Sequence, residues 1–218
     1  MGRGVSIDLP APPPVDELRR LGIRPEEYQV VDADTEWWRV HMTTSPYSLP
    51  WNAFRTYGPK LRFDPHPPPE GFHADYGIWY GASSAVTALA EVFQSTRTIE
   101  MVPNTPYLTA FSFTRPVKLL NVADGSAGTW PTRVGGSYAM STAPHATTQQ
   151  WAHAIVSAFP DLDGIYYLSR FGGEPAIALF TPAQEALPAH PLMSLPLTHR
   201  DLLDRLAVAA RRLGYGLV

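Results

Sequence analysis

Cysteine is absent from this chain of 218 residues. Its absence excludes disulfide bonds, thiolate metal sites and a cysteine nucleophile. No run of about 18 apolar residues occurs either, so the sequence predicts no membrane-spanning helix. The first 14 residues, MGRGVSIDLPAPPP, lack the apolar core of a signal peptide. We therefore expect a cytoplasmic protein.

Lysine is scarce, because only Lys60 and Lys118 among the 17 basic residues are lysines. The compositional bias of a GC-rich genome explains the excess of arginine, although guanidinium groups also suit bidentate recognition of phosphate or carboxylate. The net charge of −3 argues against direct binding of nucleic acid. A hydrophobic content of 44% and a charged content of 17% are typical of a globular protein with a substantial core.

The common catalytic signatures are also missing. The chain has no G-x-G-x-x-G after a strand, no P-loop and no H-E-x-x-H spacing among its histidines. Segments 81–85 (GASSA) and 135–139 (GGSYA) resemble a nucleophile elbow but lack its closing glycine. We therefore predict neither a hydrolase triad nor a metal site.

The most informative stretch that is present is Tyr76–Gln94. It predicts a buried strand at 78–82 and then a helix that Ser83 or Ser84 caps. Glu91 is the one acid in this apolar helix. Since burying a carboxylate is costly without a partner, we place Glu91 at the edge of a cavity; the alternative is the solvent-facing stripe of a half-buried helix.

Periodicity and turn residues predict the other elements, although no βαβ alternation or internal repeat is visible. Strands are expected at 36–42, 107–113, 117–122, 164–168 and 176–180, with 107–113 and 117–122 forming an antiparallel hairpin. Helices are expected at 15–21, 147–159 and 198–213, the last with a capping box of Thr198 and Asp201. Residues 123–140 are predicted as a loop and 182–196 as a Pro-rich linker. The pattern indicates an α+β fold with mainly antiparallel or mixed sheets and flanking helices.

Polar residues stand at the ends of several apolar elements. They are Arg39 in an aromatic strand, Arg62 beside Phe63, Tyr80 near a strand end, Glu91, and Ser169 at another strand end. Each has an ordinary structural alternative: an arginine in solvent at a sheet edge or in a loop, a core tyrosine, or a turn serine.

Taken in order, these segments resemble the RES domain, the toxin half of RES–Xre toxin–antitoxin systems. The matching segments are WRVH around Arg39, GPKLRFDP around Arg62, IWYGASSAVTALAEVF from Ile78 to Phe93, and the region from Trp151 to Phe180. The resemblance divides the chain into an N-terminal extension (1–35), a RES-like catalytic domain (36–182), and a linker and C-terminal helix (183–218). Asp64 departs from the family, which commonly has asparagine there.

The resemblance implies an ADP-ribosyltransferase-like fold and cleavage of the nicotinamide–ribose bond of NAD⁺ as substrate, with no metal. It implies catalytic or binding roles for Arg39, Tyr80, Glu91 and Ser169, and NAD⁺ binding by Arg62. Glu91 would stabilise the oxocarbenium-like transition state, and Arg39, with Arg62 as second candidate, would hold the pyrophosphate. Tyr80 would orient the nicotinamide, and Ser169 would bind substrate or position Arg39.

The acceptor and the partners stay open at this point. A glycohydrolase or phosphorylase, a protein mono-ADP-ribosyltransferase and a non-enzymatic nucleotide- or partner-binding module are all compatible with these residues. The resemblance also implies an Xre-type helix-turn-helix antitoxin as a partner. The sequence assigns neither the oligomeric state nor a role for the proline-rich insert at 59–70.

Overall fold

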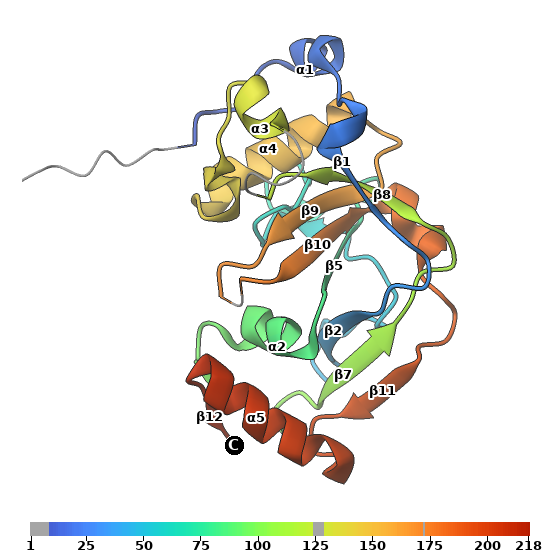
Figure 1. Ribbon diagram of the computed structural model, residues 1–218, viewed down its shortest axis with the longest axis vertical. Coiled ribbons are helices and arrows are strands. Elements are labelled where there is room, and N and C mark those ends of the chain that lie inside the picture. Colours follow the sequence, from blue (N-terminus) through green and yellow to red (C-terminus); the bar gives the residue numbers. More distant parts are fainter. Residues whose placement is uncertain (1–8, 124–128, 172) are drawn as a thin grey trace, which may run out of the picture.

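The computed structural model describes residues 9–123, 129–171 and 173–218 (Figure 1). The α-helices are α1 (Val15–Leu21), α2 (Ala85–Phe93), α3 (Trp130–Arg133), α4 (His145–Ala158) and α5 (Leu203–Leu213). The 3-10 helices are Pro25–Glu27, Tyr138–Ser141, Thr181–Ala186 and Arg200–Leu202. The strands are β1 (Tyr28–Val31), β2 (Trp37–Met42), β3 (Tyr57–Gly58), β4 (Gly71–Phe72), β5 (Ile78–Ala82), β6 (Thr98–Ile99), β7 (Pro106–Phe111), β8 (Val117–Asn121), β9 (Gly164–Leu168), β10 (Pro175–Phe180), β11 (Met193–Pro196) and β12 (Gly216–Leu217).

The fold is centred on an eight-stranded sheet in the order β1-β8-β9-β10-β5-β2-β7-β11. All neighbouring pairs are antiparallel except β8 and β9, which run parallel. In Figure 1, α1, α3 and α4 lie at one end of the molecule near β9, and α2 and α5 lie at the other end near β2 and β7. The predicted α+β class, with a mixed sheet and flanking helices, is confirmed.

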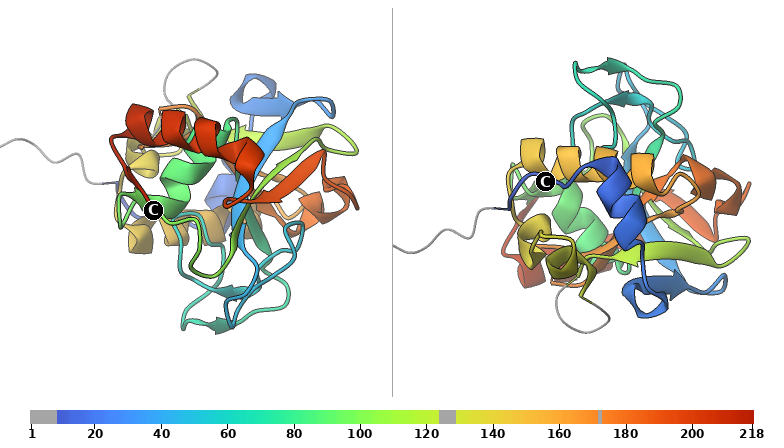
Figure 2. Two further views of the ribbon diagram at one scale, coloured as in Figure 1. Left: turned by 90° about the horizontal axis from the view of Figure 1, so that it is seen from below. Right: turned by 90° about the horizontal axis from the view of Figure 1, so that it is seen from above.

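Strand alternation divides the core between the two faces of the sheet. In β10, Ala176, Ala178 and Phe180 pack in the cluster that contains α4, whereas Ile177 and Leu179 pack with Trp79 on the other side. A third cluster joins the sheet to α2 and α5, which lie against each other at one end of the molecule (Figure 2). Ala82 of β5 pairs with Ala176 and shares a face with Ile78, so the α4 cluster and the α2–α5 cluster lie on the same face of the sheet. The opposite face is covered by the 3-10 helix Thr181–Ala186 and by Trp51 and Phe54.

The predicted strand and helix at Tyr76–Gln94 are confirmed as β5 and α2. Ser84 is the N-cap of α2, and its hydroxyl oxygen accepts a hydrogen bond from the Thr87 amide at 3.2 Å. Most of the helix is buried, as predicted, but Val92 is exposed. The glutamate of α2 is therefore carried by a capped helix that packs on the sheet.

The predicted hairpin of the two strands after α2 is wrong. β7 lies between β2 and β11, while β8 lies between β1 and β9. Both strands are buried along most of their length, so each lies inside the sheet and pairs on both sides with strands that are far away in the sequence. A short connection between them therefore does not indicate pairing.

Three further predictions are corrected. The loop expected at 123–140 contains α3 and the start of a 3-10 helix, although residues 124–128 lie outside the described ranges. The Pro-rich linker expected at 182–196 contains most of a 3-10 helix and the edge strand β11. No capping box starts the last helix, because the His199 side chain accepts from the Asp201 amide instead. Gly214, with φ of 67°, ends α5 as predicted.

The N-terminal segment 9–35 packs closely on the rest of the chain. β1 pairs with β8 along its whole length. The indoles of Trp151 and Trp130 donate to the Pro10 and Gly22 carbonyls at 2.7 and 3.2 Å. The buried carboxylate of Glu27 is ion-paired with Arg133. The segment therefore contributes a strand and a layer of contacts over α3 and α4.

No helix in the described part of the chain is long and apolar enough to span a bilayer.

Candidate active site

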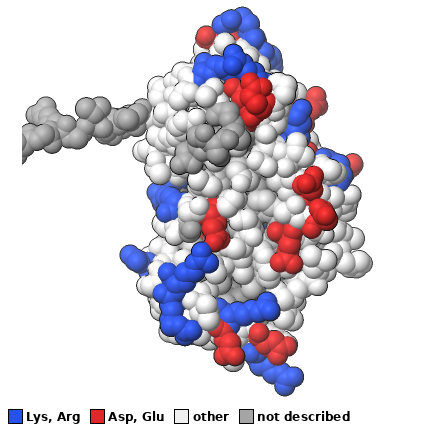
Figure 3. All heavy atoms as spheres, viewed as in Figure 1, with Lys and Arg blue, Asp and Glu red and all other residues white. Residues whose placement is uncertain are grey.

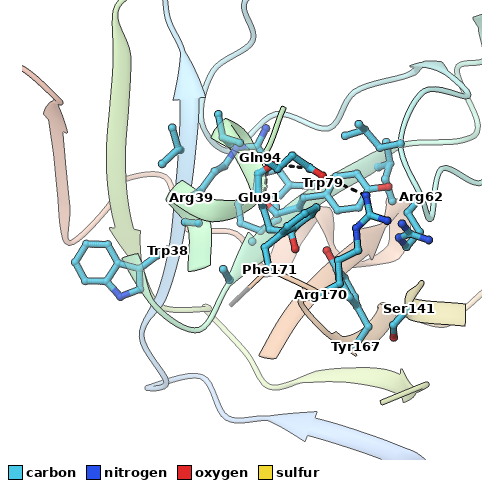
Figure 4. A pocket seen from close by; sticks show the side chains of 18 of the residues that line it. Trp38, Arg39, Arg62, Trp79, Glu91, Gln94, Ser141, Tyr167, Arg170 and Phe171 are labelled. Atoms are coloured by element: carbon cyan, nitrogen blue, oxygen red, sulfur yellow. Dashed lines mark hydrogen bonds between the residues drawn. The ribbon is translucent and has the colours of Figure 1, made fainter. Parts of the chain in front are cut away.

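A cavity of about 220 Å³ opens between β2, β5, α2 and the start of α4. We call it the central cavity. Its lining includes four of the five predicted site residues: Arg39, Arg62, Tyr80 and Glu91. In Figure 4, Glu91 lies between Arg39 and Arg62. Residues that are far apart in the sequence thus meet in one hollow.

Arg39 extends from the middle of β2 across the face of Trp79, with its guanidinium carbon 4.7 Å from the ring centroid. Its Nη1 donates to the Tyr80 carbonyl at 3.0 Å, but its buried Nε has no hydrogen-bond partner among the described residues. Burial, with a smaller contribution from Arg55, lowers the pKa of Arg39 to about 10. The group stays charged at neutral pH and is left with an unused donor.

Glu91 sits two turns into α2, on the same stripe as Ser84 and Thr87. Burial raises the pKa of Glu91, because removal from water disfavours the charged form. The Ser169 hydroxyl, which hydrogen-bonds the carboxylate, and the nearby Arg62 and Arg170 guanidinium groups offset part of this rise. The carboxylate is therefore weakly compensated and open to a cationic partner.

Tyr80 has a fully occupied hydroxyl. It donates to Asp64 Oδ1 at 2.8 Å and accepts from the Phe63 amide at 3.2 Å. Burial, and then the charge of Asp64, raise the pKa of Tyr80 well above its ordinary value. Asp64 itself is completely buried and pairs with both oxygens to Arg55 at 2.8 Å. The tyrosine thus presents its ring, and not a free hydroxyl, to the central cavity.

Arg62 and Ser169 are fixed by local contacts. Arg62 donates through Nη1 to the Ala143 carbonyl, and burial is the main cause that lowers its pKa. Ser169 follows β9, is buried, and accepts through its hydroxyl oxygen from the Phe171 amide at 3.2 Å. The prediction that Ser169 binds substrate or positions Arg39 stays a prediction; in the structure a hydrogen bond from Ser169 lowers the pKa of Glu91.

Sequence reasoning missed several residues of the central cavity. The most relevant are Arg55, His145, Arg170 and Phe171. Arg170 stacks on Phe171, with its guanidinium carbon 4.6 Å from the ring centroid, and its Nη2 lies 3.5 Å from Gln94 Oε1. Burial and the nearby Arg62 lower the pKa of His145. Arg170 directly follows Ser169, so the strand-end rule that selected the serine applied equally to the arginine.

The central cavity is predominantly cationic and aromatic. Arg39, Arg55, Arg62 and Arg170 line it with a single acid, Glu91. Such a lining suits an anion that carries a planar or cationic group at one end. No cluster of three or more potential metal ligands occurs in the part of the chain that the structure describes.

Fold and cavity together define an α+β protein with an arginine-rich site around a half-buried carboxylate. Residues 36–201 match the model of the RES domain, and the chain therefore belongs to the RES domain family.

A similar solved structure is the crystal structure of the M. tuberculosis MbcT–MbcA toxin–antitoxin complex. The match has a TM-score of 0.55 and 16% sequence identity, and it covers 91% of this chain and 95% of that one. At this identity, the likeness supports the fold. A search of the curated proteins finds no match.

Proposed function

We propose that this chain is a toxin that consumes NAD⁺ by cleaving the bond between nicotinamide and ribose, as a glycohydrolase or a phosphorylase. The observation that carries the proposal is that Arg39, with an unused buried donor, and Glu91, with a raised pKa, line one cavity in a RES domain. One group suits the anionic pyrophosphate of NAD⁺, and the other suits the positive charge that develops during cleavage.

The reaction replaces the nicotinamide at the ribose C1′ by an oxygen nucleophile. The C1′–N bond breaks and its electron pair leaves with nicotinamide, which departs neutral and needs no proton. A water oxygen then bonds to C1′ and releases one proton, giving ADP-ribose; inorganic phosphate in place of water gives ADP-ribose 1-phosphate. Positive charge on the ribose is greatest in between, so a fixed carboxylate stabilises the transition state more than the substrate.

Glu91 is the residue to which we assign that stabilisation. The low exposure that raises its pKa also strengthens its interaction with a nearby cation, since the surroundings screen charge less than water does. Ser169 orients the carboxylate through its hydrogen bond and keeps more of it ionised. No metal is needed for this step, because nicotinamide leaves without further activation.

The arginines and Tyr80 bind the rest of the substrate in this proposal. At about 220 Å³ the central cavity is below the roughly 300–1,000 Å³ of common ligand pockets. It therefore accommodates the nicotinamide riboside end, with the Tyr80 ring against the nicotinamide. Arg39 and Arg62 then hold the pyrophosphate, while the adenosine lies outside the cavity.

A toxin of this kind needs an inhibitor, and we propose an Xre-type helix-turn-helix antitoxin as its partner. Support comes from family membership and from the similar structure, in which a toxin is complexed with an antitoxin. We expect growth arrest and loss of cellular NAD⁺ when the chain is expressed alone. Co-expression of the neighbouring open reading frame should relieve both effects.

The decisive test is incubation of the purified chain with NAD⁺, with and without phosphate, and separation of the products by chromatography. We expect nicotinamide together with ADP-ribose or its 1-phosphate. Arg39→Gln should lose most of the activity, and the exposed Arg200→Gln serves as the matched control. Intact NAD⁺ under both conditions would overturn the proposal.

Two other outcomes identify the competing functions. Labelled NAD⁺ that yields a labelled macromolecule indicates a protein mono-ADP-ribosyltransferase. Calorimetric binding of NAD⁺ without turnover indicates a non-enzymatic nucleotide-binding module.

A further inference from the structure

A second glutamate, Glu174, holds the turn between β9 and β10 against the start of α2. One of its oxygens, Oε2, accepts hydrogen bonds from the Ser84 hydroxyl and, at 2.8 Å, from the Thr87 hydroxyl. These bonds are the main causes that lower the pKa of Glu174. An acid at a helix N-terminus is further favoured by the helix dipole. Glu174 is therefore ionised at neutral pH and acts as an anchor.

The turn that Glu174 anchors carries residues of the central cavity. The Ser169 amide donates to the Glu174 carbonyl at 2.9 Å, and the Gly173 amide donates to the Ser169 carbonyl at 2.8 Å. Arg170 and Phe171, which line the cavity, lie between these bonds. The position of the Ser169 hydroxyl is thus tied to that of Glu174.

Helix α2 and this turn meet at two points along one stripe of the helix. Glu174 accepts from Ser84 and Thr87 at the N-terminal end of the helix, and Ser169 lies close enough to Glu91, about one turn beyond Thr87, for its hydrogen bond to lower the Glu91 pKa. The first contact fixes the distance of the turn from the helix, and the second uses that distance to orient the Glu91 carboxylate. If Glu174 no longer bonds Ser84 and Thr87, only the backbone of the turn keeps Ser169 next to Glu91.

The second oxygen of Glu174 reaches the C-terminal helix. Its Oε1 accepts from Arg212 Nη2 at 2.8 Å, and the side chains are 29% and 59% exposed. Arg212 lies in the last turn of α5, beyond the residues 36–201 that match the family. Basic side chains gather on this end of the molecule (Figure 3). A helix outside the matched region is thereby connected to the candidate catalytic carboxylate.

We propose that Glu174 is a positioning residue for Glu91 and that Arg212 of α5 holds it in place. The inference rests on the proposed function for its kinetic readout, and on the hydrogen bonds of Glu174 together with the influence of Ser169 on Glu91 for its structural one. Glu174 touches neither the cavity lining nor the reacting atoms in this assignment. It acts through Ser169, and α5 acts through Glu174.

The test compares four variants of the full chain: Glu174→Gln, Arg212→Ala, Arg212→Lys and Arg211→Ala. Arg211 is the exposed neighbour of Arg212 on the same helix and controls for the loss of one positive charge. We measure kcat and KM for NAD⁺, and amide hydrogen exchange of the peptide that contains Ser169. Melting temperatures report the purely structural effect.

Glu174→Gln is expected to lower kcat by about tenfold with little change in KM, as for a lost charge-assisted hydrogen bond. Arg212→Ala should lower kcat by roughly two- to fivefold, because the ion pair is partly exposed. Arg212→Lys should restore most of the rate, since a single hydrogen bond joins the pair, and Arg211→Ala should behave as wild type. Exchange at Ser169 should quicken in the same order as kcat falls.

The outcomes separate this proposal from the function it rests on. A wild-type chain without NAD⁺ turnover removes the proposed function, while the exchange measurement still tests the anchor. Unchanged kcat and unchanged exchange in Glu174→Gln would overturn the inference. So would a lower melting temperature with unchanged kcat, which would make Glu174 purely structural.

Discussion

The surroundings of two carboxylates differ sharply: Glu91, which lines the central cavity, and Asp64, which hydrogen-bonds the lining residues Arg55 and Tyr80. Asp64 is completely buried and receives hydrogen bonds from Arg55, from Tyr80 and from the amides of Lys60 and Leu61. Glu91 receives a hydrogen bond from Ser169 and only distant help from Arg62 and Arg170. The first charge is neutralised by the fold, whereas the second is left for a ligand.

The same contrast holds for two arginines of the central cavity. Arg55 donates through Nη2 to both oxygens of Asp64, so its charge is already paired within the fold. Arg39 rests on an aromatic ring and a carbonyl, and it has no carboxylate partner among the described residues. Arg39 and Glu91 are removed from water without an ion-pair partner in the described parts of the chain, which costs free energy when no ligand is bound. A bound substrate of complementary charge would offset that cost.

The largest effect is expected from Asp64→Ala. Removal of this completely buried carboxylate leaves the half-buried Arg55 without its ion-pair partner and the Tyr80 hydroxyl without its acceptor, so the free energy of unfolding should fall by about 3–5 kcal/mol. Denaturant titration measures the loss, and the exposed Asp34→Ala is the control. An Asp64→Ala chain as stable as wild type would remove the distinction drawn here between the two acids.

Glu91→Gln should separate activity from stability. We expect kcat to fall by about 10²–10³-fold, as for loss of one preorganised charge at a reacting centre. Because burial raises the pKa of Glu91, the folded state binds its proton more tightly than the unfolded state does. Its contribution to stability is present below the ordinary pKa of 4.5 and is lost as the pH rises through the folded pKa. A neutral amide avoids that loss, so the melting temperature at pH 7 should rise.

The exposed Glu185→Gln is the control for that pair of measurements. A Glu91→Gln chain with a lower melting temperature at pH 7 would contradict the assignment of an uncompensated carboxylate.

Replacement by methionine directly compares Arg39, which has no carboxylate partner among the described residues, with Arg55, which is paired with Asp64. Arg39→Met should raise the melting temperature, because it removes a buried cation without a carboxylate partner, and should increase the KM for NAD⁺ by about tenfold or more. Arg55→Met should lower the melting temperature, because it leaves Asp64 without its ion pair. Thermal scans and initial rates of the two variants suffice. Shifts of the same sign in both would contradict the contrast.

Ser169→Ala should give the smallest effect. Since the Ser169 hydrogen bond lowers the pKa of Glu91, its removal should raise that pKa further. The activity of the ionised carboxylate then falls off at a higher pH as the solution is acidified, while the rate at the alkaline plateau drops by only severalfold. The pH profile of kcat checks the shift. An unmoved acidic limb would show that Ser169 does not act on Glu91.

Local sequence patterns were sufficient for the elements that carry the site. Alternation in β2, the apolar run of β5 and the serine cap of α2 are short-range features, and they placed Arg39 and Glu91 on the correct elements. The neighbours of β7 and the neighbours of β8 in the sheet were not predictable in this way, since these partner strands lie far along the chain. Edge strand β11 was also missed, because prolines at 188, 191 and 196 conceal its alternation.

The candidate site was predictable where a polar residue interrupts an apolar pattern. Arg55 escaped because it lies in the long irregular stretch before β5, where no periodicity marks a residue as buried. The ion pair of Arg55 with Asp64 was not predicted, for the same reason. Asp64 was noted only because the family commonly has asparagine at that position. Ser169 was found, but its contact with Glu91 depends on the packing of the β9–β10 turn on α2.

The family match begins at residue 36, which invites trimming of everything before it. Strand β1 would then be lost, and β8 would become a bare rim of the sheet with its amides and carbonyls open to other molecules. Trp130 and Trp151 would lose the carbonyls of Gly22 and Pro10 that receive their indole protons. Aggregation or poor expression of a shortened chain would therefore reflect the exposed edge of the sheet and not toxicity. The first 35 residues are needed to keep that edge covered.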